Sequence, residues 1–184
     1  MAGRVLCCAL LIFLYENISA LTLDELKNDP QFNPQNLLGH FRKFKFKFAS
    51  EVQSPDNFLK NKCGDCDDFA MLASIILREK GYTPRLIAVR LKRFVHVVCY
   101  VQETQSILDF NQRKQWKKPF HCEPDLREIA NAVAATFGQE WTSASEFTFD
   151  RGLKRLVKTV LDDENRAPIP AAPALIQPPL LTRE

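Results

Sequence analysis

The segment Gly64-Asp65-Cys66-Asp67-Asp68-Phe69-Ala70 decides the fold of this 184-residue chain, because it places a cysteine where a polar turn gives way to an amphipathic helix. Apolar residues recur at helical spacing after it, and Gly81 is suited to end the helix. The first turn of a helix carries unpaired backbone N–H groups and a partial positive charge, and both stabilise a thiolate. The pattern therefore predicts that Cys66 is a nucleophile at the start of a helix capped by Asp65.

Two further residues suited to nucleophilic chemistry lie in apolar, strand-like runs downstream of this helix. His96 stands in the run 94–101, and Asp109 stands in the run 107–110. A thiol needs a base to take its proton, and a carboxylate that orients the base completes the set. The order Cys, His, Asp therefore predicts a catalytic triad of Cys66, His96 and Asp109.

The runs 94–101 and 107–110 form a predicted hairpin, whose register decides how His96 meets Asp109. If the turn centres on residues 102–103, positions that sum to 205 lie opposite each other, and His96 pairs with Asp109. A turn centred on Thr104 makes the two residues near-diagonal neighbours, which long side chains still bridge. Both registers predict contact between the imidazole and the carboxylate.

The other elements follow from hydrophobic periodicity. Residues 41–48 alternate phenylalanine and lysine, which predicts a half-buried strand whose lysines form either a solvated face or an anion-binding surface. Ser54 and Pro55 are typical of a helix start. We also expect a strand over 85–91, a helix over 126–137 and a final amphipathic helix over 153–161, opened by Asp150.

Composition favours one globular domain with a hydrophobic core, since 46% of the residues are hydrophobic. A formal net charge of +3 is too small to indicate a nucleic-acid partner. We expect a protein or peptide substrate and no stable membrane insertion. The sequence carries no signal of an oligomeric state.

Two terminal segments are expected to lie outside the domain 21–166. Residues 1–20 read as a signal peptide, with Arg4 before an apolar run and small residues up to Ala20. Residues 167–184 hold five of the chain's 11 prolines and read as a disordered tail. The first of these segments predicts a secreted or periplasmic protein.

These motifs together resemble the transglutaminase-like superfamily, and in particular its bacterial cysteine proteinases. The resemblance rests on the heptapeptide around Cys66, the Gly-Tyr-Thr-Pro-Arg at 81–85 that ends its helix, Phe94-Val95-His96-Val97-Val98, and Ile107-Leu108-Asp109. It covers roughly residues 41–112. It implies an α+β, papain-like fold in which the nucleophile helix packs on an antiparallel sheet. It also implies that Cys66, His96 and Asp109 form the triad.

The expected reaction is attack of Cys66 on a peptide or glutamine-type amide to give a thioester. We favour hydrolysis of the thioester by water, as in a peptidase or amidase, and keep protein-glutamine amine transfer as the alternative on the same fold. The backbone N–H of Cys66 is the natural donor to the oxyanion. Gln53 and Asn61 are candidate side-chain donors.

The cysteines and acids of the segment leave other chemistries open. Cys63 creates a CxxC with Cys66, which permits a disulfide or a thioredoxin-like redox pair. Cys63, Cys66, His96 and Cys99 form a zinc-like inventory, which would suit a non-catalytic binding module, but His96 and Cys99 should face opposite sides of a strand.

No cofactor is expected for the predicted reaction. Some members of the proteinase branch bind calcium through acids beside the nucleophile, and these positions map onto Asp65 and Asp67. Capping and dipole stabilisation explain the same acids without a metal ion.

Overall fold

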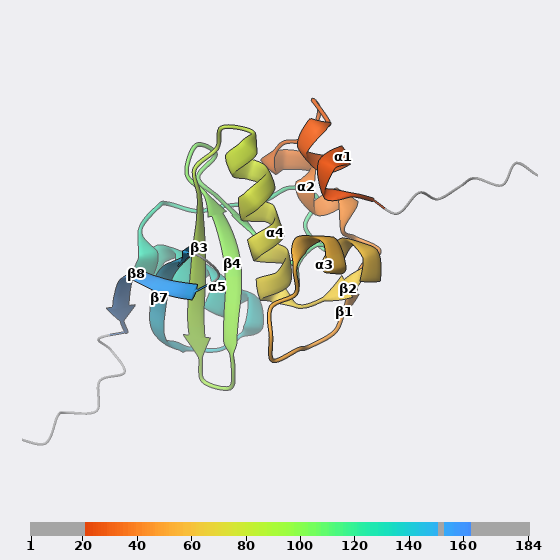
Figure 1. The fold of residues 1–184 in the computed structure, drawn as a ribbon. Coiled ribbons are helices and arrows are strands. Elements are labelled where there is room, and N and C mark those ends of the chain that lie inside the picture. Colours follow the sequence, from red (N-terminus) through yellow and green to blue (C-terminus); the bar gives the residue numbers. More distant parts are fainter. Residues whose placement is uncertain (1–20, 151–152, 163–184) are drawn as a thin grey trace, which may run out of the picture.

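The computed structural model describes residues 21–150 and 153–162, so the predicted signal peptide and the tail 167–184 lie outside the described residues. The fold is α+β, as predicted. A six-stranded antiparallel sheet in the order β6-β5-β4-β3-β7-β8 carries helices on both faces (Figure 1). In the part of the chain that is described, no helix is long and apolar enough to cross a bilayer.

The elements in chain order are α1 (Leu23–Asn28), α2 (Pro34–His40), β1 (Lys45–Phe46), α3 (Pro55–Asn61), β2 (Cys63–Gly64), α4 (Cys66–Glu79), β3 (Pro84–Leu91), β4 (Val95–Val101), β5 (Ser106–Leu108), β6 (Phe120–His121), α5 (Leu126–Phe137), β7 (Trp141–Asp150) and β8 (Leu153–Leu161). Strands β1 and β2 pair in parallel as a separate two-stranded sheet.

Helix α4 covers one face of the sheet and packs against β3 and β4 (Figure 1). Its apolar residues predicted from helical spacing are all buried: Phe69, Ala70, Ala73, Ile76 and Leu77. They join one hydrophobic core with Leu86, Val97 and Cys99 of the strands. The packing confirms that the nucleophile helix lies on an antiparallel sheet.

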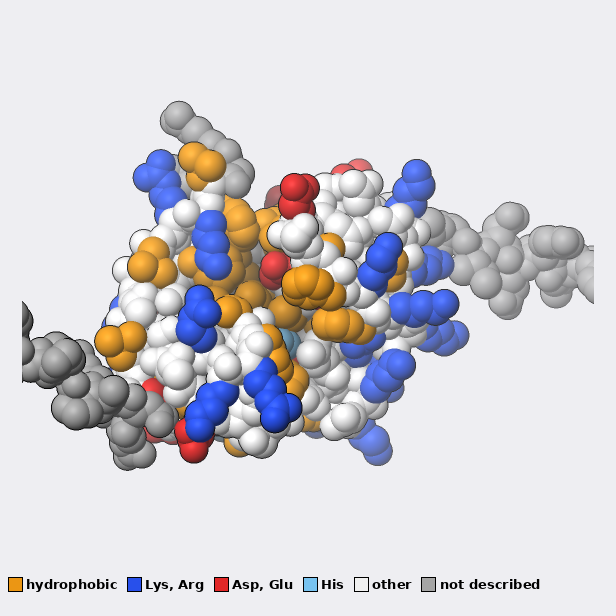
Figure 2. Space-filling model, turned by 90° about the horizontal axis from the view of Figure 1, so that it is seen from below, with side chains coloured by type: hydrophobic (Ala, Val, Ile, Leu, Met, Phe, Trp, Pro, Cys, Tyr) orange, Lys and Arg blue, Asp and Glu red, His pale blue; other side chains and the backbone are white. Residues whose placement is uncertain are grey.

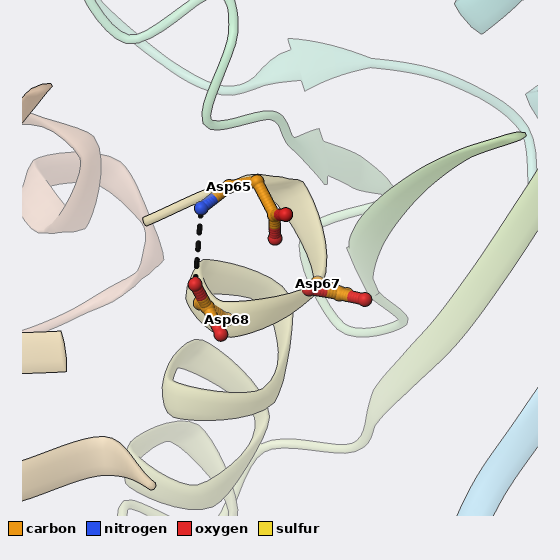
Figure 3. A group of neighbouring side chains, drawn as sticks. All are labelled: Asp65, Asp67 and Asp68. Atoms are coloured by element: carbon orange, nitrogen blue, oxygen red, sulfur yellow. Dashed lines mark hydrogen bonds between the residues drawn. The ribbon is translucent and has the colours of Figure 1, made fainter. Parts of the chain in front are cut away.

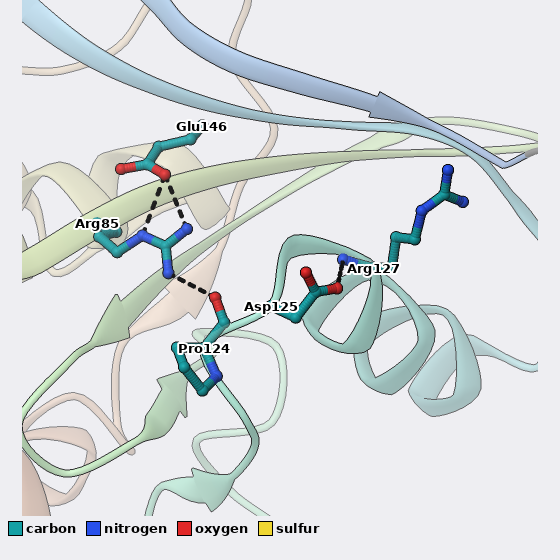
Figure 4. Close-up of polar contacts among 5 residues, drawn as sticks. All are labelled: Arg85, Pro124, Asp125, Arg127 and Glu146. Atoms are coloured by element: carbon teal, nitrogen blue, oxygen red, sulfur yellow. Dashed lines mark hydrogen bonds and ion pairs between the residues drawn. The ribbon is translucent and has the colours of Figure 1, made fainter.

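Helix α5 covers the opposite face and packs against β3 and β7. Asp125 caps it by accepting from the backbone N–H of Arg127 (2.8 Å), and Gly138 ends it with a φ of 57°. Just before this cap, the Arg85 guanidinium donates to Pro124 O and to Glu146 Oε2 of β7 (Figure 4). Arg85 therefore ties the start of α5 to two strands of the sheet.

A buried aromatic cluster joins the segment before β1 to α3, α4 and the loop after β5. Its rings contact one another at centroid distances of 5.0 to 6.0 Å, and its members are Phe41, Phe44, Phe58, Phe69 and Phe110. Because these rings come from four separate parts of the chain, they fix the start of α4 relative to the loop that carries Asp109.

The buried Arg113 side chain completes this junction. Its guanidinium lies 3.7 Å from the centre of the Phe110 ring and donates to the backbone carbonyls of Phe41 (3.1 Å), Phe110 (2.5 Å) and Phe44. Burial lowers its pKa. Arg113 therefore holds residues 41–44 against the loop after β5.

The predicted helix over 153–161 is wrong. These residues form strand β8, which pairs with β7 from Ser143–Leu161 to Asp150–Leu153. The helical spacing of Leu153, Leu156 and Leu161 does not reflect burial, since all three are exposed. Pairing with a strand edge overrode a weak local preference, as tertiary context commonly does.

The predicted strand over 41–48 is also largely wrong. Only Lys45–Phe46 is strand, and Phe44 is buried whereas Phe46 and Phe48 are exposed. The alternation of phenylalanine and lysine therefore does not mark a half-buried strand. The two exposed phenylalanines instead border a cleft.

Replacing Arg113 with methionine should lower the free energy of unfolding by roughly 3 kcal/mol or more, because it leaves three buried carbonyls without a donor. Urea denaturation of the purified protein measures this loss. The exposed Arg42, changed to methionine in the same way, should shift the unfolding free energy by about 0.5 kcal/mol or less. Equal losses in both variants would contradict the role assigned to Arg113.

Candidate active site

Cys66 is the first residue of α4 and is half-buried, as the sequence predicted. Asp65 occupies the N-cap position with extended backbone, and the Cys66 side chain packs against the core beneath α4. The thiol therefore lies at the positive end of a 14-residue helix, the environment that favours a thiolate.

The buried Asp68 carboxylate organises the backbone around Cys66. It accepts from the Gln53 backbone N–H (2.6 Å), from Gln53 Nε2 (2.7 Å) and from the Asp65 N–H (3.0 Å). Gly64 lies so close that a Cβ added there would stand 2.3 Å from Asp68 Oδ2. This position therefore excludes a side chain, and the glycine lets β2 pass over the carboxylate.

His96 and Asp109 meet in the interior of the protein. His96 Nε2 lies 3.0 Å from Asp109 Oδ1, and the two residues are 1% and 0% exposed. Asp109 Oδ1 also accepts from the Asn111 N–H (2.8 Å). The imidazole contacts the Phe137 ring edge-on at a centroid distance of 4.8 Å, so α5 helps to orient it.

The predicted contact between His96 and Asp109 is present, but neither predicted register is correct. The β4–β5 ladder pairs Cys99 with Leu108 and Tyr100 with Ile107, so opposite positions sum to 207 rather than 205. Both His96 and Asp109 lie beyond this ladder. Their side chains meet diagonally where β5 has ended.

Electrostatics in the site favour a positively charged imidazole. Burial lowers the pKa of His96, but the charge of Asp109, its hydrogen bond, and a hydrogen bond and charge from Cys66 together raise the pKa to about 10. The Cys66 side chain therefore lies close enough to interact with the ring. An imidazolium next to a thiol is the arrangement that stabilises a thiolate.

A cleft of about 590 Å³ opens over Cys66 and His96. Its other polar lining residues are Ser50, Asp65, Asp67, Asn111 and Lys154, and its apolar ones are Phe46, Phe48, Ala49, Phe94, Val95 and Val97. Figure 2 shows hydrophobic side chains gathered around a hollow, with lysine and arginine side chains at its border and beyond. Cys66 and His96 therefore lie in one cleft, and Asp109 contacts His96 from the interior of the protein.

The candidate side-chain donors for an oxyanion are engaged elsewhere. Gln53 Nε2 donates to Cys63 O (3.1 Å) and to Asp68, and Gln53 Oε1 accepts from Asn61 Nδ2 (2.9 Å). Gln53 and Asn61 therefore support the loop before α4. The Cys66 backbone N–H at the start of α4 remains the donor that helix geometry provides.

The three acids of the heptapeptide differ in their surroundings (Figure 3). Asp68 turns back to the Asp65 N–H, whereas the Asp67 carboxyl points away from it. Burial, a side-chain hydrogen bond to Asp65 and the charges of Asp65 and Asp68 together raise the pKa of Asp67 from 3.8 to about 7, and burial is the largest of these causes. Asp67 therefore holds a proton near neutral pH.

These acids partly fit a metal ion. One ligand atom from each of Asp65, Asp67 and Asp68 lies within 4.8 Å of the others. Asp65 Oδ2 accepts from Ala49 N–H, while Oδ1 is buried without a partner among the described residues. Both oxygens of Asp68 are already used by nitrogen donors, so Asp65 and Asp67 are the residues that fit a calcium ion.

The zinc arrangement is not found in the described residues. Among the described residues, one group of side chains lies close enough to hold a metal ion, and it consists of Asp65, Asp67 and Asp68. The predicted zinc ligands Cys63, Cys66, His96 and Cys99 are not grouped in this way. Cys99 is buried beneath α4, and its pKa is raised to about 12 by burial. All four cysteines in the described chain are free thiols.

Asn111 belongs to the site but was missed from the sequence. It follows Asp109 by two residues, donates its N–H to that carboxylate and lines the cleft. An aspartate that accepts from the N–H two residues on is a common turn, so this spacing was the available signal.

Comparisons with known proteins bear on the fold. Residues 15–116 match the family model of a transglutaminase-like domain. A comparison with curated proteins gave no match. Calcium-bound LapG of Legionella pneumophila is 18% identical with a TM-score of 0.46, over 73% of this chain and 73% of that one. Another structure of Legionella pneumophila LapG is 18% identical with a TM-score of 0.47, over 77% and 76%.

Substitutions of the neighbouring acids Asp67 and Asp68 should change the free energy of unfolding at pH 8 in opposite directions. The native state holds the Asp67 proton up to about pH 7 and the unfolded chain releases it near 3.8, so this group makes the free energy of unfolding fall as pH rises between these values. Asp67→Asn has no carboxyl group to ionise, so its free energy of unfolding should fall less between these pH values. At pH 8 the variant should therefore be more stable than the parent protein.

Asp68→Asn is the matched comparison for this effect. It turns a buried acceptor of three N–H groups into a partial donor, so it should cost about 2 to 4 kcal/mol. Urea denaturation at pH 5 and pH 8 measures both variants. A loss of the same size for Asp67→Asn at pH 8 would refute the difference assigned to the two acids.

Proposed function

The chain belongs to the transglutaminase-like domain family, and on that premise we propose that it is a cysteine-nucleophile hydrolase of peptide or glutamine-type amides. Cys66 is the nucleophile, His96 the general base and acid, and Asp109 the residue that orients the imidazole. The observation that carries this proposal is a half-buried thiol at a helix start, in one cleft with a buried His96–Asp109 pair. Family membership supports the cysteine-protease-type class in general.

In the proposed first step, the Cys66 thiolate attacks the carbonyl carbon of the amide. The oxyanion that forms accepts from the Cys66 N–H. When the C–N bond breaks, the imidazolium of His96 gives its proton to the leaving amine, and a thioester with Cys66 remains. Asp109 keeps the imidazole oriented through its 3.0 Å contact.

In the second step, His96 takes one proton from water as the water oxygen attacks the thioester. The C–S bond then breaks, which releases a carboxylic acid and restores the Cys66 thiolate beside the His96 imidazolium. Water is the proposed acceptor because Cys66 is only half-buried in an open cleft. Transfer to an amine needs a site that excludes water from the thioester. Amine transfer on the same fold stays the alternative.

These steps need no resident cofactor. A calcium ion would be held by Asp65 and Asp67, and it would supply positive charge that relieves their repulsion. None of the steps above passes through it. The chain's own residues bind the acyl group and move the protons.

We also propose that the protein is exported to the periplasm or the exterior, which rests on the signal peptide predicted over residues 1–20. The proposed partner is a protein or peptide substrate, with no nucleic acid. N-terminal sequencing of the mature chain tests the export step, because cleavage after Ala20 would leave Leu21 first.

Alkylation by iodoacetamide across pH tests the nucleophile. In Cys63→Ser, which removes the neighbouring thiol, Cys66 should react at pH 6 although free cysteines titrate near 8.5. Cys99 and Cys122 should stay unmodified, because burial raises their pKa to about 12 and about 11. His96→Ala should slow the reaction of Cys66 at pH 6 by roughly 100-fold. Mass spectrometry of the peptides gives each rate.

His121→Ala is the control for this experiment, because His121 lies in β6 and does not line the cleft. Its alkylation profile should match that of the parent. A Cys66 rate that rises only above pH 8, or one that His96→Ala leaves unchanged, would refute the proposed triad.

Cleavage of a protein substrate in ¹⁸O-labelled water tests the acceptor. One labelled oxygen should enter each new carboxyl group, because water supplies it when the thioester opens. Cys66→Ser should form no product. Incorporation of an added primary amine in place of the label would show that the protein is an amine transferase rather than a hydrolase.

A further inference from the structure

Four exposed apolar side chains lie around the cleft over Cys66. Phe48 is 78% exposed and Phe46 52%, and they line the cleft together with the partly exposed Phe94 and Val95. Side chains of this size cost free energy when they face water, and a contiguous apolar patch marks a surface that binds something. Their position next to the nucleophile makes the bound group part of the substrate.

The apolar residues form two walls from different parts of the chain. One wall is the segment 46–50 that begins in β1, and the other is the start of β4 with Phe94, Val95 and Val97. Phe94 is held at its place by the edge-on contact with Phe137, at a centroid distance of 5.3 Å. Cys66 and His96 lie in the same cleft, so a chain bound between the walls passes over the thiol.

Strand β1, whose residue Phe46 lines the cleft, has an open backbone edge. Lys45 and Lys47 donate their N–H groups to Lys62 O (2.9 Å) and Gly64 O (2.8 Å) on the side of β2. The N–H and C=O of Phe46 therefore point to the other side, where the two-stranded sheet has no further strand among the described residues. An extended peptide can add to such an edge.

Asn111 adds a polar contact point in the cleft. Its side-chain oxygen is buried and has no hydrogen-bond partner among the described residues, although the side chain lines the cleft. An unpaired buried acceptor destabilises the free protein, and the N–H of a bound peptide would satisfy it. The cleft thus combines apolar walls with an acceptor for a main-chain donor.

We propose that this cleft selects extended peptide segments that carry a bulky apolar side chain next to the scissile bond, with Phe48 and Phe94 as the residues that determine this preference. The proposal rests on the proposed function, since it names the substrate class of the same site. Lys154 and Asp65 bring opposite charges to the lining, so charge gives a weaker selection than apolar contact.

Two peptidyl vinyl sulfones that differ in one residue test this preference. One carries phenylalanine next to the reactive group, and the other carries asparagine, which is uncharged. The Cys66 sulfur adds to the vinyl carbon, and the neighbouring carbon takes a proton, so labelling follows substrate binding without turnover. We expect the phenylalanine probe to label Cys66 of the parent protein at least about tenfold faster.

Phe48→Ser and Phe94→Ser should each reduce the ratio of the two rates to about threefold or less. Phe120→Ser is the matched control, because Phe120 is exposed on β6 and lies outside the cleft. It should leave the ratio unchanged. Iodoacetamide, which has no apolar side chain, should react with Cys66 at the same rate in all four proteins.

The results separate the two levels of the proposal. If iodoacetamide shows a reactive, His96-dependent Cys66 but both probes label at equal rates, the inferred selectivity is wrong while the proposed function stands. A ratio that persists in both serine variants also overturns the role of Phe48 and Phe94. If Cys66 lacks the predicted reactivity toward iodoacetamide, the proposed function fails and the inference fails with it.

Discussion

The buried carboxylate of Asp68 is the constraint on which the candidate site depends. A charge that is 1% exposed needs donors on every side, and it obtains them from the backbone and side chain of Gln53 and from the Asp65 N–H. Those contacts fix the chain before α3 and the turn before α4. Gly64 is required because a Cβ would collide with the same carboxylate. The position of Cys66 is therefore a consequence of satisfying one buried acid.

The buried pair of His96 and Asp109 depends on a different part of the fold from the Asp68 carboxylate. Asp109 lies past the end of β5, and its loop is held by Phe110 in the aromatic cluster and by Arg113 on three carbonyls. Because that cluster includes Phe69 of α4, the loop of Asp109 and the helix of Cys66 share one rigid support. The imidazole reaches Cys66 from the sheet, so three parts of the fold meet at the residues of the proposed triad.

Much of this arrangement could be predicted from the sequence, and the exceptions have physical reasons. Helix α4 and strands β3 and β4 follow from periodicity because their apolar residues really are buried. In β8 the same periodicity misled, since Leu153 and Leu156 are exposed and pairing with β7 decides the conformation. Asp67 and Asp68 are adjacent and identical in type, but only Asp68 stands three residues after the N-cap Asp65, where a capping box joins its carboxylate to the Asp65 N–H. The other two donors to Asp68 come from Gln53, which no local pattern around Cys66 predicts.

The buried acids and the exposed phenylalanines have different roles in the proposed site. The groups proposed to move protons are rigid, because buried charges must keep their partners. Phe46 and Phe48 carry no such requirement. Phe46 ends a strand of only two residues, and Phe48 lies beyond it. Their exposure costs the free protein stability that contact with an apolar ligand would recover. In the proposed site, the reacting groups are therefore fixed by buried contacts, whereas the exposed phenylalanines of the segment 46–50 are available to contact the substrate.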